Sequence, residues 1–309
     1  MNDRPIVQTP KARSSSWRAA IPWWAKISAK VVLSRLPVSG RVWQMLRIFS
    51  PGDMLLPHYA IGVFRVHYER AGRPAPGFAY LELGPGDSLA TAAVAWAHGA
   101  GGGWLVDAGS YAARDIALYR PLLDALIARR TELGLTRDAS ELLACKTIDE
   151  LLERTGCQFR EHGLADLKAV PANSIDFVLS QAVLEHVPRA EFTETMRELC
   201  RLMKPGAASS HQIDFKDHLG GSLHNLHFSN EFWEKPWFAQ RSGFYTNRLQ
   251  FSDMLRDLTA AGFAVDVVCR ETWDELPVEK RKLPLPFRER SDEDLKIQTV
   301  ELIAKKHGA

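Results

Sequence analysis

The sequence predicts an α/β fold with a doubly wound, mostly parallel sheet. From residue 79 onward, short apolar strands alternate with segments of helical periodicity. Alternation of this kind implies parallel strands joined by crossover helices. The first strand ends at Glu82 and breaks into a glycine turn, and the second ends at Asp107. Because ligands bind outside the carboxyl ends of such strands, these turns are the first place to look for a site.

Each predicted element is an apolar or helically periodic run bounded by turn residues. Strands are expected at 79–83, 103–107, 158–161, 175–180, 207–214, 263–270 and 297–303. Helices are expected at 59–70, 88–98, 113–133, 139–145, 148–155, 189–202 and 252–261. The main domain would span 77–309, with a helical insertion at 109–155 and a lid at 211–250 that is rich in His, Asn, Trp and Phe.

The N-terminal part has a different composition from the rest. Residues 1–50 carry nine lysines and arginines against one acid, a net charge of +8, which leaves −6 for the remainder of a chain of net charge +2. We expect a disordered tail at 1–16 and a basic helical arm at 17–72. Two interpretations of 17–49 stay open: a helix that packs on the domain, or a tryptophan-bearing helix that lies on an anionic membrane surface.

Composition favours a globular protein of a reducing compartment. The chain has 309 residues, 46% hydrophobic and 25% charged, and four cysteines with no Cys-x-x-Cys pair. This pattern predicts neither a disulfide framework nor a zinc site. No signal peptide and no uncharged run of roughly 20 residues is visible. We therefore expect a cytoplasmic protein, with peripheral contact to the inner membrane face as the open alternative.

The first turn has the chemistry of a site for a cationic ligand. Gly84 and Gly86 allow the backbone to turn sharply and to approach a ligand closely. Glu82 and Asp87 stand on either side of the turn, and these acids disfavour a pyrophosphate. The dinucleotide-binding fingerprint would also need a third glycine where this chain has Leu89, which argues against a nicotinamide enzyme.

Two later segments carry a family resemblance. The stretch Ser180-Gln181-Ala182-Val183-Leu184-Glu185-His186-Val187, with the strand before it, and Leu202-Met203-Lys204-Pro205-Gly206 look like strand motifs of class I S-adenosylmethionine-dependent methyltransferases of the type-11 and type-23 kind. The resemblance covers about 79–270. It implies a Rossmann-like fold and S-adenosyl-L-methionine as the cofactor, whose amino and sulfonium groups suit the acids of the first turn.

The resemblance also assigns site residues. In that family, Glu82, Gly84, Gly86, Asp107 and Asp166 correspond to cofactor contacts. Ser180 and Gln181 lie beside the methionine part, and Asp87 flanks the glycine turn. Asp107 would accept hydrogen bonds from both ribose hydroxyls. Asp166, expected at the end of a strand, would accept one from the adenine amino group; the alternative for Asp166 is a turn or a helix cap.

A narrower bacterial group, found among genes for surface polysaccharide or natural-product assembly, resembles the chain at 211–222 and 242–248. The lid then supplies the acceptor site. Neutral His218 is the expected base, oriented by Asp217 or Asp214, and the alternative is that these residues only bond to each other. Their spacing fits no metal signature, so no metal is predicted. Asn247 and Arg248 would hold an acceptor anion, and the lid aromatics form either the lid's own core or a stacking platform.

The expected reaction is O-methylation of a sugar or glycan precursor. The alternatives are N- or carboxyl-methylation of a small metabolite, and a non-catalytic S-adenosylmethionine-binding protein. Nucleic acid is not expected as a partner, because the body is acidic and Ser180 to Val183 stand where a nucleic-acid amino-methyltransferase would carry an Asn/Asp-Pro-Pro-aromatic motif. The sequence predicts no oligomeric state.

Overall fold

The computed structural model describes residues 53–308. The predicted tail at 1–16 and the predicted membrane-contacting segment at 17–49 lie outside the described residues. Within the described part, no helix is long and apolar enough to cross a membrane.

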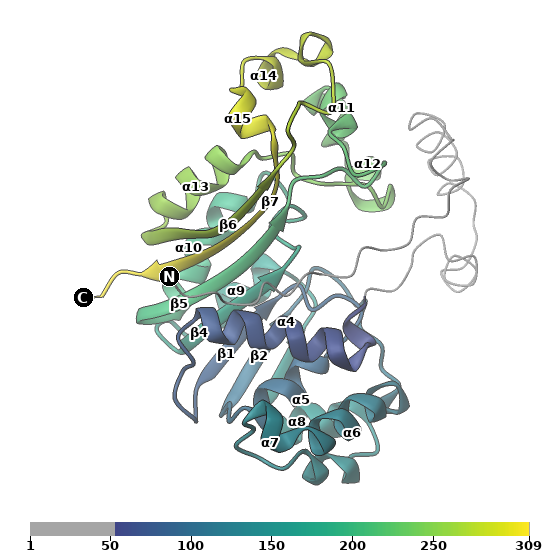
Figure 1. Cartoon of the computed structure of the whole chain (residues 1–309), viewed down its shortest axis with the longest axis vertical. Coiled ribbons are helices and arrows are strands. Elements are labelled where there is room, and N and C mark those ends of the chain that lie inside the picture. Colours follow the sequence, from purple (N-terminus) through teal and green to yellow (C-terminus); the bar gives the residue numbers. More distant parts are fainter. Residues whose placement is uncertain (1–52, 309) are drawn as a thin grey trace.

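A seven-stranded sheet in the order β3-β2-β1-β4-β5-β7-β6 forms the centre of the molecule (Figure 1). Its strands are β1 (Ala79–Leu83), β2 (Gly102–Val106), β3 (Cys157–Arg160), β4 (Ile175–Gln181), β5 (Met203–Asp214), β6 (Phe263–Thr272) and β7 (Ile297–Lys306). The pairs from β3 to β5 are parallel, and β7 runs antiparallel to both β5 and β6. This confirms the predicted α/β class with a doubly wound, mostly parallel sheet.

Helices cover both faces of the sheet, and each face has its own core. One core contains α4 (Pro57–Arg70), α5 (Ala90–Ala97), α6 (Arg120–Ala128) and α8 (Ile148–Thr155). The other contains α9 (Leu164–Ala169), α10 (Phe192–Leu202) and α13 (Phe251–Ala260). Phe192, Met196 and Leu199 show why α10 packs there, because their spacing places them on one helix face, and all three are buried.

Helix α4, the described end of the predicted basic arm, belongs to the core of the domain. Ala60, Ile61 and Phe64 are buried against the sheet and α5. Pro57 occupies the first turn of α4, where its missing N–H has no intrahelical partner to lose. The residues from 57 to 70 therefore pack on the domain, whereas both interpretations of 17–49 concern residues outside the described part and stay predictions.

The insertion after β2 is helical, as predicted, but its first helix is divided. The predicted helix 113–133 appears as η2 (Ile116–Tyr119), α6 and α7 (Arg130–Leu133), followed by η3 (Ala139–Ala144). Asp115 caps the start of η2 by accepting from the Ala117 N–H, and Gly134 ends α7 in the left-handed conformation. Local capping thus sets boundaries that the apolar periodicity alone did not show.

The predicted lid is a small helical unit with its own core. After β5 it contains η4 (His224–His227), α11 (Asn230–Trp233) and α12 (Pro236–Arg241). Trp233, Phe238 and Tyr245 are buried together, with Phe228 and Phe232 packed on them. The interpretation of these aromatics as the lid's own core is therefore confirmed for most of the cluster.

The segment between β6 and β7 packs on the lid. It forms η5 (Lys280–Lys282), α14 (Leu285–Arg288) and α15 (Asp292–Leu295). A cluster joins the two parts, made of Leu223, Leu226, Leu283, Phe287 and Leu295. The charged residues of η5 are exposed or half-buried, whereas Leu283 and Phe287 beside them are buried.

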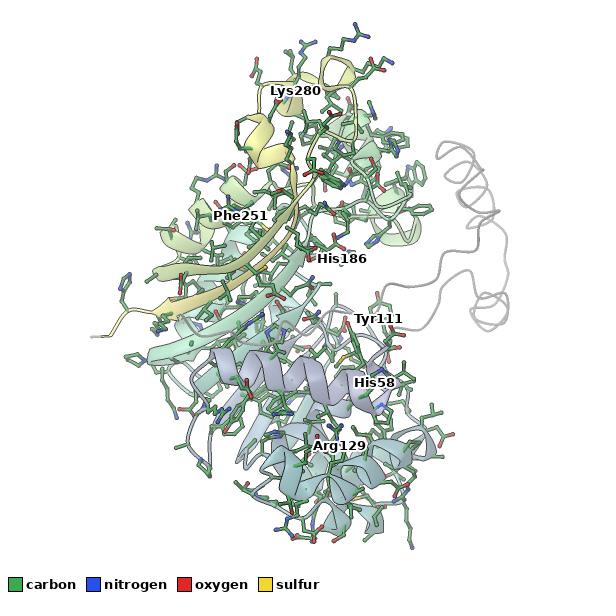
Figure 2. The ribbon with its side chains drawn as sticks, viewed as in Figure 1. His58, Tyr111, Arg129, His186, Phe251 and Lys280 are labelled. Atoms are coloured by element: carbon green, nitrogen blue, oxygen red, sulfur yellow. The ribbon has the colours of Figure 1, made fainter. Side chains whose placement is uncertain are left out.

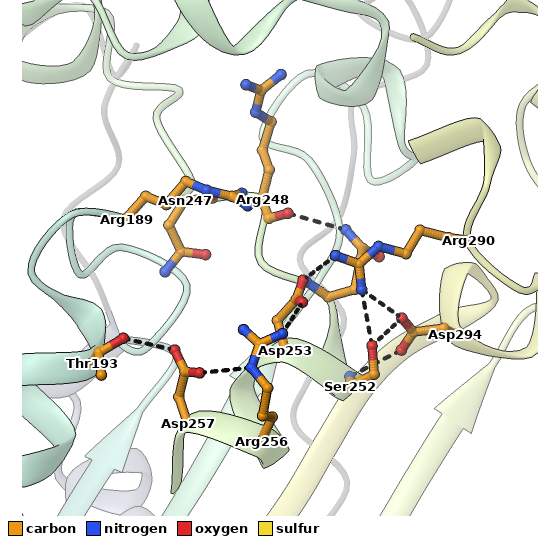
Figure 3. A network of polar contacts seen from close by, with 11 residues as sticks. Arg189, Thr193, Asn247, Arg248, Ser252, Asp253, Arg256, Asp257, Arg290 and Asp294 are labelled. Carbon is orange, nitrogen blue, oxygen red and sulfur yellow. Dashed lines mark hydrogen bonds and ion pairs between the residues drawn. The ribbon is translucent and has the colours of Figure 1, made fainter. Parts of the chain in front are cut away.

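A network of polar and charged residues joins the start of α13 to the segment between β6 and β7 (Figure 3). The Arg290 guanidinium donates to Asp253 at 2.6 Å and to Ser252 at 3.0 Å, and Ser252 donates to Asp294 at 2.6 Å. Because the Asp253 side chain is almost completely buried, its ion pair with Arg290 is shielded from solvent. The first turn of α13 and the start of α15 are held together in this way.

Candidate active site

The carboxyl ends of β1, β2 and β4 meet at one edge of the sheet. From β1 the chain moves outward to β2 and β3 and then returns to β4 on the other side of β1, so the order reverses between β1 and β4. A crevice at such a reversal is where α/β sheets bind ligands. Tyr111, which follows β2, and His186, which follows β4, lie toward the same side of the molecule in Figure 2.

The glycine turn after β1 has the predicted conformation. Gly84 and Gly86 have φ of +70° and +67°, a region that favours glycine. A Cβ on Gly84 would stand 2.5 Å from both γ carbons of Val183, so this glycine allows the β1 and β4 loops to touch. A Cβ on Gly86 would meet no atom of the described chain within 4 Å, so open space lies beside it.

Two acidic side chains near this turn have an oxygen without a partner. Within residues 53–308, Oε2 of Glu82 and Oδ2 of Asp87 are buried and accept no hydrogen bond. Burial raises the pKa of Glu82 to about 8 and that of Asp87 to about 6. Unpaired carboxyl oxygens of this kind would be stabilised by a cation, which is the type of ligand that the sequence predicted for the turn.

Asp107 holds the glycine turn in place. Its Oδ2 accepts from the Gly86 N–H at 2.8 Å, and its Oδ1 accepts from the Ala108 N–H at 2.7 Å. Burial raises its pKa despite these hydrogen bonds. The residue therefore connects the ends of β1 and β2, and its role toward a ribose stays a prediction.

Glu161 is a site candidate that sequence reasoning missed. It follows β3 directly, its charge contributes to the raised pKa of Asp107, and within the described residues its buried Oε1 has no partner. The signal was present in the sequence, because β1 and β2 also end in or just before an acid, Glu82 and Asp107.

Asp166 does not lie at the end of a strand, as was predicted, but in the first turn of α9. Its Oδ2 accepts from the His162 N–H at 2.7 Å and lies 3.2 Å from Nδ1 of the same residue. This is the local turn contact that we gave as the alternative. The strand β3 ends at Arg160, and Asp166 follows it in the short helix α9.

Ser180 and Gln181 point to opposite faces of the sheet, because successive strand residues alternate. Ser180 is fully buried, and its Oγ lies 2.7 Å from Nδ1 of His211 on β5. Gln181 is partly exposed at the end of β4, and its Oε1 lies 3.0 Å from Nε2 of His67 on α4. The structure therefore does not bring the two predicted cofactor contacts together.

The two acids predicted beside His218 have hydrogen bonds of another kind. Asp217 is buried and accepts from the backbone N–H groups of five residues, namely Leu219, Gly220, Gly221, Ser222 and His224. Asp214 accepts from the Lys216 N–H at 2.9 Å and pairs with Lys216 Nζ at 3.1 Å. Asp217 thus organises the loop that carries His218, and these hydrogen bonds give neither acid an orienting role toward that ring.

His186 is the side chain that contacts the His218 ring. The two imidazoles are stacked with an interplanar angle of 4°, and their Nε2 atoms are 3.2 Å apart. Nδ1 of His186 lies 2.9 Å from the Tyr245 carbonyl oxygen. No local signal in the sequence predicts this contact, because the two histidines are 32 positions apart.

The hydrogen bonds define where the protons lie. A carbonyl oxygen only accepts, so Nδ1 of His186 carries a proton and its Nε2 accepts from Nε2 of His218. Desolvation and then the adjacent His218 lower the pKa of His186 to about 4. Neutral His218 then has its unprotonated nitrogen at Nδ1.

Asn247 and Arg248, predicted to hold an anion of the acceptor, instead hold the lid. The Asn247 amide donates to the carbonyl oxygens of Leu184 and Val187 at 2.8 and 3.0 Å. The buried Arg248 guanidinium donates to the Phe228 carbonyl at 2.7 Å and to Asn230 Oδ1 at 2.6 Å. It also lies over the rings of Trp233 and Phe287, at 4.9 and 5.2 Å from their centroids.

Comparisons with known proteins agree with the resemblance. Residues 122–209, less than half of the chain, match the model of a methyltransferase domain family. The matched segment contains Asp166, Ser180 and Gln181 but not the glycine turn. No curated protein matches the chain at a significant level.

Several solved structures are similar to the chain. The YcgJ protein from Bacillus subtilis is 14% identical, with 82% of this chain and 100% of that chain covered and a TM-score of 0.42. A Haemonchus contortus phosphoethanolamine N-methyltransferase, in complex with phosphomonomethylethanolamine and S-adenosylhomocysteine, is 15% identical, with 88% and 61% covered and a TM-score of 0.45. An arsenic(III) S-adenosylmethionine methyltransferase from Chlamydomonas reinhardtii is 16% identical, with 76% and 66% covered and a TM-score of 0.40. Likenesses at this level carry no argument about the reaction.

Residues 122–209 carry the match to a methyltransferase domain, and the sheet has the predicted Rossmann-like order. Both findings agree with the class I S-adenosylmethionine-dependent methyltransferase that the sequence resembles, a class whose cofactor is S-adenosylmethionine. The residues of the glycine turn fit S-adenosylmethionine. Within residues 53–308 the buried oxygens of Glu82 and Asp87 have no partner and suit a cationic ligand, and Gly86 leaves room beside the backbone.

Proposed function

We propose that the protein O-methylates a hydroxyl group of a sugar or glycan precursor, with His218 as the base. The observation that carries the proposal is the His186–His218 pair, with His218 exposed on the lid and its Nε2 held by a second imidazole. A hydroxyl acceptor must lose a proton as it is methylated, and a neutral imidazole is suited to take that proton near pH 7.

Glu82, Asp87, Gly86, Asp107 and Gln181 would hold the cofactor at the carboxyl edge of the sheet. When bound, S-adenosylmethionine supplies a methyl group on a positively charged sulfur. The unpaired oxygens of Glu82 and Asp87 would balance the positive charge of such a ligand. Gly86 would let the ligand approach the backbone closely, because no described atom fills the space beside it.

His218 and His186 would act on the acceptor as a pair. As the acceptor oxygen takes the methyl group that the cofactor would supply, Nδ1 of His218 would accept the proton of the hydroxyl. The resulting imidazolium keeps its Nε2 hydrogen bond to neutral His186. The Tyr245 carbonyl fixes the His186 tautomer, so the lone pair on Nε2 stays directed at His218.

The alternatives differ in what they require of the base. A carboxylate acceptor has no proton to lose, so carboxyl-methylation would depend little on His218. Methylation of an amine would depend less on a base than methylation of a hydroxyl. A non-catalytic cofactor-binding protein would not depend on His218 at all. Contact of 17–49 with an anionic membrane, which would suit a lipid-linked acceptor, is a further proposal that co-sedimentation with anionic vesicles tests.

The experiment measures methyl transfer from labelled S-adenosylmethionine to a panel of hydroxyl, amine and carboxylate acceptors. We compare the wild type with His218→Gln, His186→Leu and the control His227→Gln, which removes another lid histidine. We expect His218→Gln to lower kcat at least about 100-fold, with unchanged cofactor affinity. His186→Leu should have a smaller effect, and the control none.

Activity of His218→Gln equal to that of the wild type would contradict the proposed base. Methyl transfer to carboxylates alone would replace the proposal by the carboxyl-methylation alternative. Cofactor binding without transfer to any acceptor of the panel would favour the non-catalytic alternative.

A further inference from the structure

A buried histidine on α4 contacts the sheet directly beneath the site. His67 is 1% exposed, yet its two ring nitrogens both have polar partners. Nδ1 lies 2.8 Å from Oγ of Ser210 on β5, and Nε2 lies 3.0 Å from Oε1 of Gln181 at the end of β4. Burial lowers its pKa to about 4, so the ring is neutral at physiological pH.

The contacts of Gln181 determine the direction of these hydrogen bonds. The Gln181 amide oxygen can only accept, so Nε2 of His67 carries the proton and donates to it. Nδ1 of His67 then accepts from the Ser210 hydroxyl.

A chain of hydrogen bonds therefore runs from β5 through α4 to the edge of the sheet. It fixes the tautomer of His67 and leaves Gln181 one orientation of its amide. Burying the polar ring nitrogens is unfavourable unless each has a hydrogen-bond partner, and an apolar residue could fill the same space without that cost. At the site, the hydrogen-bond partner of His67 is Gln181.

We propose that His67 is a positioning residue for the cofactor, which acts by holding the Gln181 side chain in one orientation at the carboxyl end of β4. This inference rests on the proposed function, because it assumes that Gln181 contacts the cofactor. It adds α4, which lies before the sheet in the sequence, to the parts of the chain that determine cofactor affinity.

The test is a double-mutant cycle on cofactor affinity, measured by calorimetric titration of the full chain with S-adenosylmethionine. The variants are His67→Phe, Gln181→Ala and the double variant. His67→Gln is the conservative replacement, since its amide can donate to Gln181. The matched control is His98→Phe, because His98 is also buried beside α4 but bonds to the Val94 carbonyl of its own helix.

We expect His67→Phe to weaken binding about 5- to 10-fold, the loss of roughly one hydrogen bond. His67→Gln should recover most of the affinity, and His98→Phe should bind like the wild type. The double variant should bind no more weakly than Gln181→Ala, because effects that act through one residue are not additive. Thermal unfolding of each variant separates these effects from a general loss of stability.

Additive effects of His67→Phe and Gln181→Ala, or an equal loss in His98→Phe, would overturn the inference. If His67→Phe does not fold, Ser210→Ala replaces it. Ser210→Ala removes the donor to Nδ1 of His67, and wild-type affinity in that variant would also overturn the inference. Failure of the cofactor assignment is distinguishable, because the wild type itself would then show no binding. Failure of the proposed O-methylation alone would leave cofactor binding and its dependence on His67 in place.

Discussion

Gly84 and Gly86 have nearly the same backbone conformation but different surroundings, which makes their alanine variants a matched pair. Their φ angles are +70° and +67°. An alanine in this left-handed region costs roughly 1–2 kcal/mol. Gly86→Ala should lose only this amount of unfolding free energy, because nothing in the described chain lies within 4 Å of the added carbon.

Gly84→Ala should lose more unfolding free energy than Gly86→Ala, because its new methyl group contacts Val183. The new methyl would stand 2.5 Å from two carbons of that side chain, and forcing extra volume into a packed region costs about 1–3 kcal/mol. The expected loss for Gly84→Ala is therefore about 2–5 kcal/mol, as the sum of these two effects. In a Val183→Ala background most of the packing part should disappear, because only the Cβ at 3.1 Å remains, and the loss in Gly84→Ala should approach that in Gly86→Ala.

The assay is urea unfolding, with the free energy extrapolated at a common slope. Equal losses for Gly84→Ala and Gly86→Ala in the wild-type background would refute the close approach of the β1 and β4 loops. Cofactor titration of Gly86→Ala gives the second readout. That variant should bind S-adenosylmethionine more weakly although it is the more stable of the two, since its methyl enters the open space.

Three other predictions concern the pH dependence of stability and the lid. Burial raises the folded-state pKa of Glu185 to about 8 from an ordinary 4.5, so the unfolded chain gives up this proton at a lower pH than the folded protein does. The stability measured by thermal melts should therefore fall as pH rises from about 4.5 to 8, and Glu185→Gln should remove part of that fall. Asp217→Asn should lose about 1–3 kcal/mol in thermal or urea unfolding, because its amide nitrogen cannot accept the backbone N–H groups that the carboxylate accepts; unchanged stability would contradict this. Arg248→Lys keeps the charge but not the planar fork, so limited proteolysis should cut the lid faster than in the wild type, while protection equal to the wild type would count against the anchoring role.

The regular elements were predictable because their signals are local. The strand at 79–83 and the helix at 148–155 have in the structure the bounds that the sequence predicted. Both are apolar patterns between clear turn or capping residues, so neighbours in sequence suffice to define them. The same holds for the glycine turn, where only the positive φ of Gly84 and Gly86 had to be inferred.

Apart from Asp166, the residues whose surroundings the sequence did not predict are those with distant contacts. Whether Ser180 or Gln181 faces α4 depends on how β4 is oriented against a helix more than 100 residues earlier. Arg248 looked like an anion ligand, but its partners are carbonyl groups of the lid around Phe228. His186 and His218 come together only because the lid folds back over the end of β4.

The most direct test of the account is calorimetric titration of the full chain with S-adenosylmethionine, alongside NAD as the control ligand. We predict micromolar binding of S-adenosylmethionine alone, lost in Asp107→Ala. Because the pKa of Glu82 is raised to about 8, a bound cation should release its proton at pH 7, so the heat should differ between buffers of different ionisation enthalpy. Absence of binding, or binding of NAD instead, would contradict the central claim.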